Sequence, residues 1–278
     1  MIQNSYDNSP SLYLIPTPIG NLEDITYRAV KVLEEVEVIF SEDTRVTLNL
    51  LNYFGIKKKL ISLHDHNEDI LKEKVLEYLK NGKSVGLVTD RGTPIISDPG
   101  YKTVKYISDN NYNVIAIPGA TAFVPALISS GISSQPFLFY GFLNSKDSKR
   151  RDELEMLKDN EYTIIFYEAP HRILKTLNMM LEIFGNRDIS ISREITKKFE
   201  TIYRGKINDL IANIPEKGEF VIVVSGCGDK NIDFSISIKD AVNLYINAGL
   251  DVMSSIKKVA KERNVPKNEI YKEYHKED

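Results

Sequence analysis

The chain has 278 residues, of which 42% are hydrophobic and 27% are charged, values that argue against intrinsic disorder and for one large domain or two smaller ones. A net charge of -3 excludes a globally basic surface, so any contact with nucleic acid would need a local basic patch. The single cysteine, Cys227, excludes an internal disulfide, and four His with one Cys provide no ligand spacing typical of a metal site.

The N-terminal residues, MIQNSYDNSP, lack both the basic start and the apolar core of a targeting segment. No apolar run approaches the roughly 18 residues that a membrane-spanning helix needs. We therefore expect a cytoplasmic protein without membrane contact and without a metal, whose residues 1–11 are disordered or flexible.

Short apolar, β-branched runs alternate with helical patterns along the first 225 residues, which predicts an α/β fold with mainly parallel sheets. The expected strands are residues 12–15, 36–40, 60–63, 85–89, 114–117, 137–140, 163–167, 189–192, 201–204 and 220–224. Helical patterns over 44–54 and 67–80 end at Gly55 and Gly82, since glycine commonly terminates helices.

Ten strands exceed what one small sheet usually holds, which favours two α/β domains. The polar, basic segment 144–151 is a natural boundary, so we expect an N-terminal domain over 12–143 and a C-terminal domain over 144–228. Helical patterns over 238–248, 252–263 and 266–275 predict a small helical module in 229–278. Asp251 and Pro266 mark two of its helix starts.

The stretch TDRGTPIISDPG follows the strand at 85–89. Asp98 and Pro99 are typical of a helix entry, with Asp98 as the N-cap and Pro99 at the first helical position. Asp90 and Gly92 lie at the carboxyl end of the strand, where open parallel sheets bind ligands. The alternative, equally compatible with the stretch alone, is an Asx-turn followed by a tight loop.

Two further loops, IPTPIGNL and IPGATA, also leave apolar strands at this end of the sheet. The chain has no Gly-x-Gly-x-x-Gly after its first strand and no Gly-x-x-x-x-Gly-Lys phosphate loop. The loops therefore indicate a ligand site that is neither a dinucleotide site of the Rossmann type nor a P-loop.

Six stretches in this order carry a resemblance: PTPIGNLEDITYRA, SEDTRVTLNLL, TDRGTPIISDPG, IPGATAFVPAL, FYEAPHRI and SREITKKFETIYRG. They resemble the ribosomal RNA small-subunit methyltransferase I family within the tetrapyrrole methylase superfamily. The resemblance covers roughly residues 12–226, and the helical tail is similar to that family's C-terminal module. Six ordered motifs are far more specific than any one of them.

The resemblance implies two α/β domains with S-adenosylmethionine in the cleft between them, usually in a homodimer. It also implies methylation of the ribose 2'-hydroxyl of a cytidine in the decoding region of 16S rRNA, within the small ribosomal subunit. The cofactor contacts that it implies are Pro18, Asp90, Gly92, Thr93, Ile96, Thr121, Ala122, Glu168 and Gly205. Arg91 departs from the small residue that the family usually has there, so the details of this loop are open.

A carboxylate or imidazole near the 2'-hydroxyl could take its proton, and the candidates for this catalytic role are Glu168, His171 and Glu194. Each has a structural alternative. Glu168 could make a hydrogen bond to the cofactor or the loop, and His171 could cap a helix. Glu194 could form an ion pair with a neighbouring cation.

RNA needs cationic contacts to its phosphates. The candidates are Arg45, Arg150, Arg151, Arg172, Arg193 and Lys197. Arg150 and Arg151 could equally belong to a solvated linker, and Arg45 could hold its loop by pairing with an adjacent carboxylate. Two other functions stay open: a methylase of the same superfamily acting on a corrin or sirohaem precursor, and a non-catalytic protein that binds S-adenosylmethionine or RNA.

Overall fold

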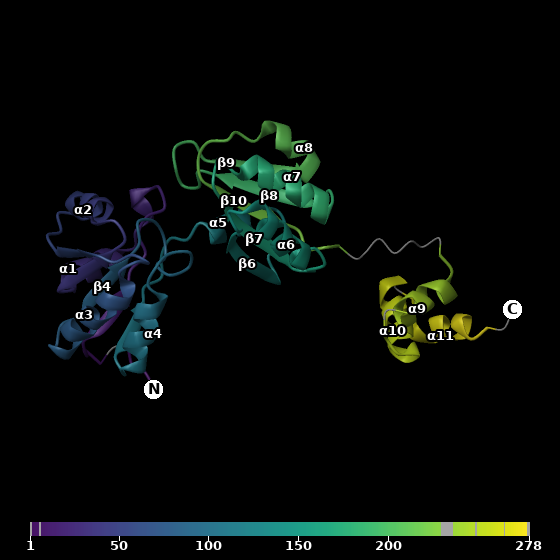
Figure 1. The fold of residues 1–278 in the computed structure, drawn as a ribbon, viewed down its shortest axis with the longest axis horizontal. Helices are drawn as coiled ribbons and strands as arrows, with labels where there is room; N and C mark the ends of the chain where they lie inside the picture. Colours follow the sequence, from purple (N-terminus) through teal and green to yellow (C-terminus); the bar gives the residue numbers. More distant parts are fainter. Residues whose placement is uncertain (1, 6, 229–235, 248, 264, 277–278) are drawn as a thin grey trace. The chain divides into compact units, whose positions relative to one another are not determined.

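Figure 1 shows a computed structural model of the protein, which describes residues 2–5, 7–228, 236–247, 249–263 and 265–276. The chain forms two compact units. The first consists of Met1–Leu157 and Tyr162–Ser225, and the second of Lys158–Glu161 and Gly226–Asp278. In the described part of the chain, no helix is long and apolar enough to cross a membrane.

The first unit holds two five-stranded sheets. The strands of the first sheet lie in the order β3 (Lys59–Ser62), β2 (Val38–Ser41), β4 (Val85–Val88), β1 (Ser11–Leu14) and β5 (Asn113–Ala116). All neighbouring strands in this sheet are parallel. The predicted α/β fold with a parallel sheet is therefore confirmed for this half of the unit.

Helices cover both faces of the first sheet (Figure 1). They are α1 (Tyr27–Glu35), α2 (Thr44–Tyr53), α3 (Glu68–Lys80) and α4 (Tyr101–Asp109), and a short 3-10 helix, η1 (Leu22–Asp24), precedes α1. Leu33 and Leu51 from α1 and α2 pack against Ile39, while Leu79 from α3 packs on the other face with Phe40. Successive strand residues point to opposite faces, which explains this division. The helices predicted over 44–54 and 67–80 are confirmed.

The strand order creates a topological switch point between β1 and β4. The chain leaves β1 toward β2 on one side, and leaves β4 toward β5 on the other. The loops that follow β1 and β4 lie side by side, since Thr17 and Gly92 exchange backbone hydrogen bonds, and they occupy the carboxyl edge of the strands, where open α/β sheets bind ligands.

The second sheet has the order β6 (Phe137–Phe142), β7 (Thr163–Glu168), β10 (Phe220–Val224), β8 (Asp188–Arg193) and β9 (Thr201–Lys206). Here the prediction of mainly parallel strands is wrong: only β6 and β7 are parallel, and the other pairings are antiparallel. The short connection between β8 and β9 contains no crossover helix, which parallel neighbours require. Residue composition alone does not reveal this difference.

Helix α5 (Phe123–Ser129) covers one face of the second sheet, where Leu127 packs with Ile165 and Val223. Ile19, from the loop after β1, belongs to the same apolar cluster and so joins the two halves of the first unit. The other face packs against α6 (Asp147–Leu157), α7 (Ile173–Phe184) and α8 (Ile207–Leu210), which a 3-10 helix, η2 (Ile211–Asn213), follows.

Two expected boundaries differ from the observed pairing. The expected domain boundary at residue 144 lies after β6. However, β6 pairs with β7 in the second sheet, so the last strand of the first sheet is β5, which precedes that boundary. Within residues 1–11, the Gln3 side chain donates to the carbonyl of Val114 and accepts from its amide. The described residues of this terminus therefore contact β5; Met1 and Tyr6 lie outside the described residues.

The second unit contains the predicted helical module: α9 (Ile238–Asn247), α10 (Val252–Arg263) and α11 (Lys267–Tyr274). Ala241, Val242, Ile256, Val259, Ala260 and Ile270 form its apolar core. Asp251 accepts a hydrogen bond from the Ser254 amide, and Pro266 is the N-cap of α11, which confirms both predicted helix starts. Ala248 and residues 229–235, 264 and 277–278 of the predicted module lie outside the described residues.

Candidate active site

A cavity of about 370 Å³ lies between loops of the first and second sheets. We call it the inter-sheet cavity. It is lined by Ile19, Arg91, Gly92, Thr93, Ile96, Ser97, Asp98, Thr121, Ala122, Phe142, Tyr167, Glu168, Ala169, Pro170, Ser192, Ile195, Glu219, Phe220 and Val221. The surface of this cavity is mostly apolar, and several polar or charged side chains converge on the same space, as is typical of small-molecule sites.

The loop after β4 is anchored to the loop after β1. Gly92 and Thr17 exchange two backbone hydrogen bonds, of 2.9 and 3.0 Å. Gly92 has a φ of +85°, and a Cβ there would lie 3.1 Å from Ile19 Cγ2 and 3.5 Å from the Ala120 carbonyl oxygen. The Thr93 hydroxyl donates to the same Ala120 oxygen at 3.0 Å. Glycine is therefore required at 92 both by conformation and by crowding.

The walls of the inter-sheet cavity contain exposed apolar side chains: Ile96 is 46% exposed and Phe142 is 53% exposed. Ile95, beside them, has a φ of +78°, which is unusual for a β-branched residue. Such backbone strain occurs at ligand and catalytic sites, where surrounding contacts hold it in place. Both features are consistent with a ligand that covers these walls.

Two polar groups of the second sheet face this cavity. The Ser192 hydroxyl is buried and has no hydrogen-bond partner within the described residues. Tyr167 packs edge-to-face against Phe139 and Phe142. Burial raises the pKa of Tyr167 to about 12, so its hydroxyl stays protonated and can donate a hydrogen bond at neutral pH.

Asp98 is a half-buried carboxylate in the lining, although its sequence context predicts only a helix cap. That interpretation is wrong, because α4 begins at Tyr101 with Gly100 as its N-cap. Burial raises the pKa of Asp98 to about 6; a hydrogen bond from the Thr89 side chain lowers it, and the nearby Glu42 and Asp90 carboxylates raise it. A carboxylate with this pKa can accept a proton near neutral pH. The only signal in the sequence that indicated Asp98 as a site residue was its position in the same loop as Gly92.

Glu168 lines the inter-sheet cavity, but its carboxylate is fully engaged. It accepts hydrogen bonds from the Ala169 amide, the Arg172 guanidinium and the Thr176 hydroxyl, at 2.7, 2.7 and 2.5 Å. Its side chain is completely buried beside Arg172. These contacts favour a structural role that holds the β7–α7 loop, and they disfavour the predicted role as proton acceptor.

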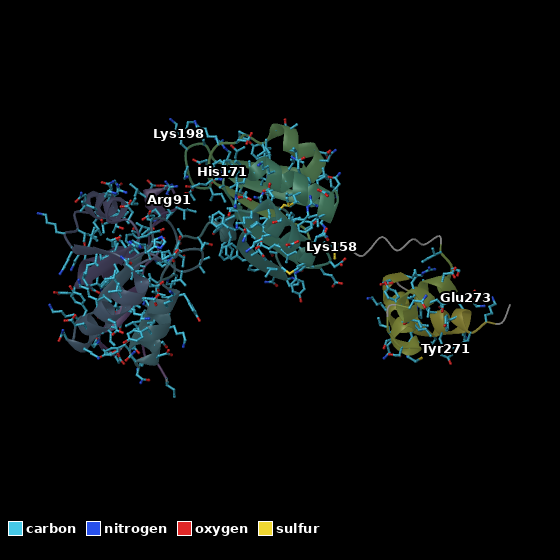
Figure 2. The ribbon with its side chains drawn as sticks, viewed as in Figure 1. Arg91, Lys158, His171, Lys198, Tyr271 and Glu273 are labelled. Atoms are coloured by element: carbon cyan, nitrogen blue, oxygen red, sulfur yellow. The ribbon has the colours of Figure 1, made fainter. Side chains whose placement is uncertain are left out.

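The other two predicted catalytic residues do not line the inter-sheet cavity. His171 is exposed at the turn that precedes α7 (Figure 2). Burial would raise the pKa of Glu194, but the hydrogen bond from the Glu219 amide and the Lys197 ammonium outweigh that effect and lower it. A carboxylate with a lowered pKa is a weaker base, so Glu194 is a poor proton acceptor.

A network of charges links the first and second sheets at the wall of this cavity. The guanidinium of Arg91, labelled in Figure 2, forms an ion pair with Glu219. The Lys197 ammonium lies 2.9 Å from Glu219 and 3.0 Å from Glu194. Arg91, the residue that departs from the family pattern, therefore points toward the second sheet and bonds with it.

A second cavity, of about 600 Å³, shares Arg91 with the first. We call it the α2 cavity. It is lined by Thr17, Pro18, Gly20, Leu22, Val46, Thr47, Asn49, Leu50, Tyr53, Thr89, Asp90, Arg91, Glu194 and Lys197. Asp90 accepts a 2.9 Å hydrogen bond from the amide of Asp43, the N-cap residue of α2. Burial raises the pKa of Asp90, and this hydrogen bond partly offsets the rise.

The structure divides the residues that the resemblance assigned to the cofactor. Gly92, Thr93, Ile96, Thr121, Ala122 and Glu168 line the inter-sheet cavity. Pro18 and Asp90 line the α2 cavity instead. Gly205 lies on β9 and lines neither of these two cavities. The resemblance implied its assignment, whereas its strand pairs with β8 at the edge of the second sheet.

The candidate RNA contacts also fall into two groups. Arg45 and Arg151 are exposed, and each pairs with a carboxylate, Asp43 and Glu182 respectively. Arg150 is only 1% exposed and donates to the carbonyls of Asn144 and Ser145, so its assignment as an RNA contact is wrong. Its guanidinium instead holds the entry of α6.

The remaining three cations are held by local contacts. Arg172 is committed to the buried Glu168, and Arg193 donates to the Lys217 carbonyl at 2.6 Å. Lys197 bridges two carboxylates, and its side chain packs against Gly20. These contacts order the loops of the site before any ligand binds.

Comparisons with known proteins identify the family. A family model described as Tetrapyrrole (Corrin/Porphyrin) Methylases matches residues 11–211. A Bacillus subtilis protein named ribosomal RNA small subunit methyltransferase I is 47% identical over 95% of this chain and 94% of its own length. The chain belongs to the ribosomal RNA small subunit methyltransferase I family of tetrapyrrole methylases. The resemblance stated from its six motifs is thereby confirmed, and the protein is a methyltransferase.

Further similarities extend the same result. A relative of the same name from Halalkalibacterium halodurans is 44% identical over 99% of both chains. Among solved structures, the uroporphyrin-III-C-methyltransferase of Thermus thermophilus matches with a TM-score of 0.55 and 18% identity, covering 78% of this chain and 94% of that one. The methyltransferase CobJ matches with a TM-score of 0.58 and 16% identity, over 78% and 95% of the two chains. These structures establish the methylase fold.

Proposed function

We propose that this methyltransferase transfers a methyl group from S-adenosylmethionine to the ribose 2'-hydroxyl of a cytidine in the decoding region of 16S rRNA. The observation that carries the proposal is the inter-sheet cavity, where motif residues shared with the family meet beside a candidate proton acceptor. Full-length relatives whose names specify small-subunit ribosomal RNA support the choice of substrate class.

The inter-sheet cavity suits S-adenosylmethionine in shape and chemistry. Its apolar walls at Ile96, Phe142 and Tyr167 can cover an adenine ring, and the unpartnered Ser192 hydroxyl offers a polar contact. Gly92 is buried against Ile19 and the Ala120 carbonyl, and its positive φ fixes the course of the loop that forms this wall. We propose Gly92, Thr93, Ile96, Thr121 and Ala122 as the residues that hold the cofactor.

The bound cofactor supplies a methyl group already activated by its sulfonium. The chain therefore has to align the acceptor oxygen and receive its proton, which are tasks of positioning and general-base catalysis. We propose Asp98 as the proton acceptor. As the ribose oxygen bonds to the methyl carbon, the bond from that carbon to the cofactor's sulfur would break and leave a neutral thioether, and the hydroxyl proton would pass to the Asp98 carboxylate.

The decisive experiment measures methyl transfer from radiolabelled S-adenosylmethionine to small ribosomal subunits from a strain that lacks this gene. Nuclease mapping would then identify the labelled nucleotide. We expect label on one 2'-O-methylated cytidine of the decoding region. Label on a base, or on another nucleotide, would contradict the proposed target. Label on a corrin or sirohaem precursor, and none on the subunit, would identify a tetrapyrrole methylase.

Three points stay to be tested: the homodimer that the resemblance implies, the cytoplasmic location that the sequence predicts, and the choice between the assembled subunit and free rRNA as the substrate. Light scattering of the purified protein tests the first, and cell fractionation tests the second. A comparison of subunits with deproteinised 16S rRNA in the transfer assay tests the third.

A further inference from the structure

The α2 cavity has no role in the cofactor binding proposed above, yet it adjoins that site. Arg91 lines both cavities. Thr17, Pro18, Thr89 and Asp90 place the α2 cavity at the carboxyl ends of β1 and β4, the switch point of the first sheet. A methyl acceptor must come into contact with the methyl donor, so its site has to adjoin the donor's site.

Helix α2 supplies one whole wall of the cavity. Val46, Leu50 and Tyr53 line it and recur at helical spacing, so they share one face of the helix, and Asn49 lies on the same face. The Tyr53 side chain is 64% exposed, and its ring packs edge-on against Phe54. Proteins that bind an unstacked base use an aromatic ring for stacking and polar side chains for its edges.

A buried polar group in the same wall lacks a partner. Thr47 is 2% exposed, and its hydroxyl makes no hydrogen bond within the described part of the chain. Buried hydroxyls are nearly always hydrogen-bonded, so an orphan in a cavity wall indicates a missing polar partner. The Asn49 amide nearby carries both donors and an acceptor, as the edge of a nucleobase also does.

The charges of the lining distinguish between ligand classes. Both of its cations already have carboxylate partners: Arg91 pairs with Glu219, and Lys197 pairs with Glu194 and Glu219. Asp90 adds a further carboxylate to the lining. A macrocycle with several carboxylates would meet repulsion here, whereas a neutral base with its ribose would not.

We infer that the α2 cavity binds the target nucleotide of the RNA, with its base against Tyr53, Asn49 and Thr47 and its ribose toward Arg91. The inference rests on the proposed function and specifies which residues recognise the substrate. The nucleotide has to leave its base stack to enter the cavity, which favours single-stranded or loosely paired RNA.

The test compares Asn49→Ala and Tyr53→Ala with matched controls. Asn52→Ala changes an exposed asparagine of the same helix that lines neither cavity. Tyr101→Ala changes a tyrosine of similar exposure, 66%, on α4. The measurements are the KM for small ribosomal subunits in the methyl-transfer assay and the Kd for S-adenosylmethionine by calorimetry. Thermal unfolding checks that each variant is folded.

We expect the KM for subunits to rise about tenfold in both test variants, in line with the loss of one base-stacking or base-edge contact. The Kd for S-adenosylmethionine should stay within about twofold of the wild-type value, and Tyr53→Phe should restore the KM, because stacking needs only the ring. The controls should match the wild type.

Two results would overturn the inference while leaving the proposed function intact. The first is wild-type methylation of rRNA with Asn49→Ala and Tyr53→Ala both indistinguishable from their controls. The second is an equal loss of cofactor affinity in these variants, which would assign the α2 cavity to the cofactor. A wild-type protein that methylates no RNA would instead refute the proposed function itself, and the inference with it.

Discussion

Arg91 and Glu219 form an ion pair although 128 residues separate them in the chain, and both line the inter-sheet cavity. Arg91 follows β4 of the first sheet, and Glu219 directly precedes β10 of the second. Glu219 also accepts from Lys197, so the pair belongs to a charge network at the place where the inter-sheet and α2 cavities adjoin.

Arg91→Ala should weaken cofactor binding several-fold without unfolding the protein. Both side chains of the pair are more than half exposed, so its loss should cost less than about 1 kcal/mol of unfolding free energy. Calorimetry at low and high salt checks this, because salt should bring the wild-type affinity closer to that of the variant. Arg151→Ala is the control, since it removes an exposed pair with Glu182 on α6 and α7. Equal cofactor affinities of Arg91→Ala and wild type would contradict the prediction.

Asp98→Asn should abolish most methyl transfer and remove the acid limb of the pH–rate profile. In the wild type, the pKa of about 6 predicts a rate that rises with pH up to about 6 and then levels off, because only the ionised carboxylate accepts a proton. The measurement is single-turnover transfer between pH 5 and 8. A variant that keeps the wild-type pH profile would exclude Asp98 as the proton acceptor.

At pH 8, Asp98→Asn should increase the free energy of unfolding, although it lowers the rate of methyl transfer. The folded-state pKa of Asp98 is raised above its usual value of 3.8, so the protonated carboxyl stabilises the folded wild type below pH 3.8, and this contribution is lost as the pH rises through about 6. At pH 8, Asp98→Asn should therefore be more stable than wild type, by about 1 kcal/mol or less once solvent screening is allowed for. Urea unfolding at pH 8 and pH 4 measures this difference. A loss of stability at pH 8 would indicate a structural role.

Glu168→Gln should destabilise the fold by about 3 kcal/mol, because it leaves the largely buried Arg172 without its carboxylate. Activity should fall only as far as the loop between β7 and α7 loses order. Chemical unfolding together with kcat under stabilising conditions separates the two effects. If the variant were stable but had lost its kcat, the result would support the predicted catalytic role of Glu168.

Gly92→Ala should both destabilise the protein and weaken cofactor binding. A left-handed conformation costs an alanine about 1–2 kcal/mol, and the added Cβ would crowd Ile19 at 3.1 Å. Gly82→Ala is the matched control: its φ is +76°, and nothing lies within 4 Å of the added Cβ. The control should share the loss of stability measured by thermal unfolding, but not the loss of affinity. Unchanged cofactor affinity in Gly92→Ala would argue against its place in the site.

The sequence by itself determined the local structure and the family. Apolar β-branched runs with glycine stops predicted the strands and helices, because hydrophobic periodicity and turn residues act over a few neighbouring positions. Asp251 and Pro266 marked helix starts for the same reason. The six ordered motifs identified the methylase family, and the position of Gly92 after an apolar strand predicted a candidate ligand loop there.

Only the tertiary structure decided how distant groups meet. The antiparallel pairing of β8 with β9 and β10 depends on how the strands assemble, and composition does not encode strand direction. The sequence predicts Arg150 as a surface cation, but its side chain is buried and donates hydrogen bonds to backbone carbonyls at the start of α6. Asp90 and Asp98 lie in one loop yet line different cavities. Burial raises the pKa of Asp98, while Lys197 and the Glu219 amide lower that of Glu194, and both effects arise from segments brought together only by folding.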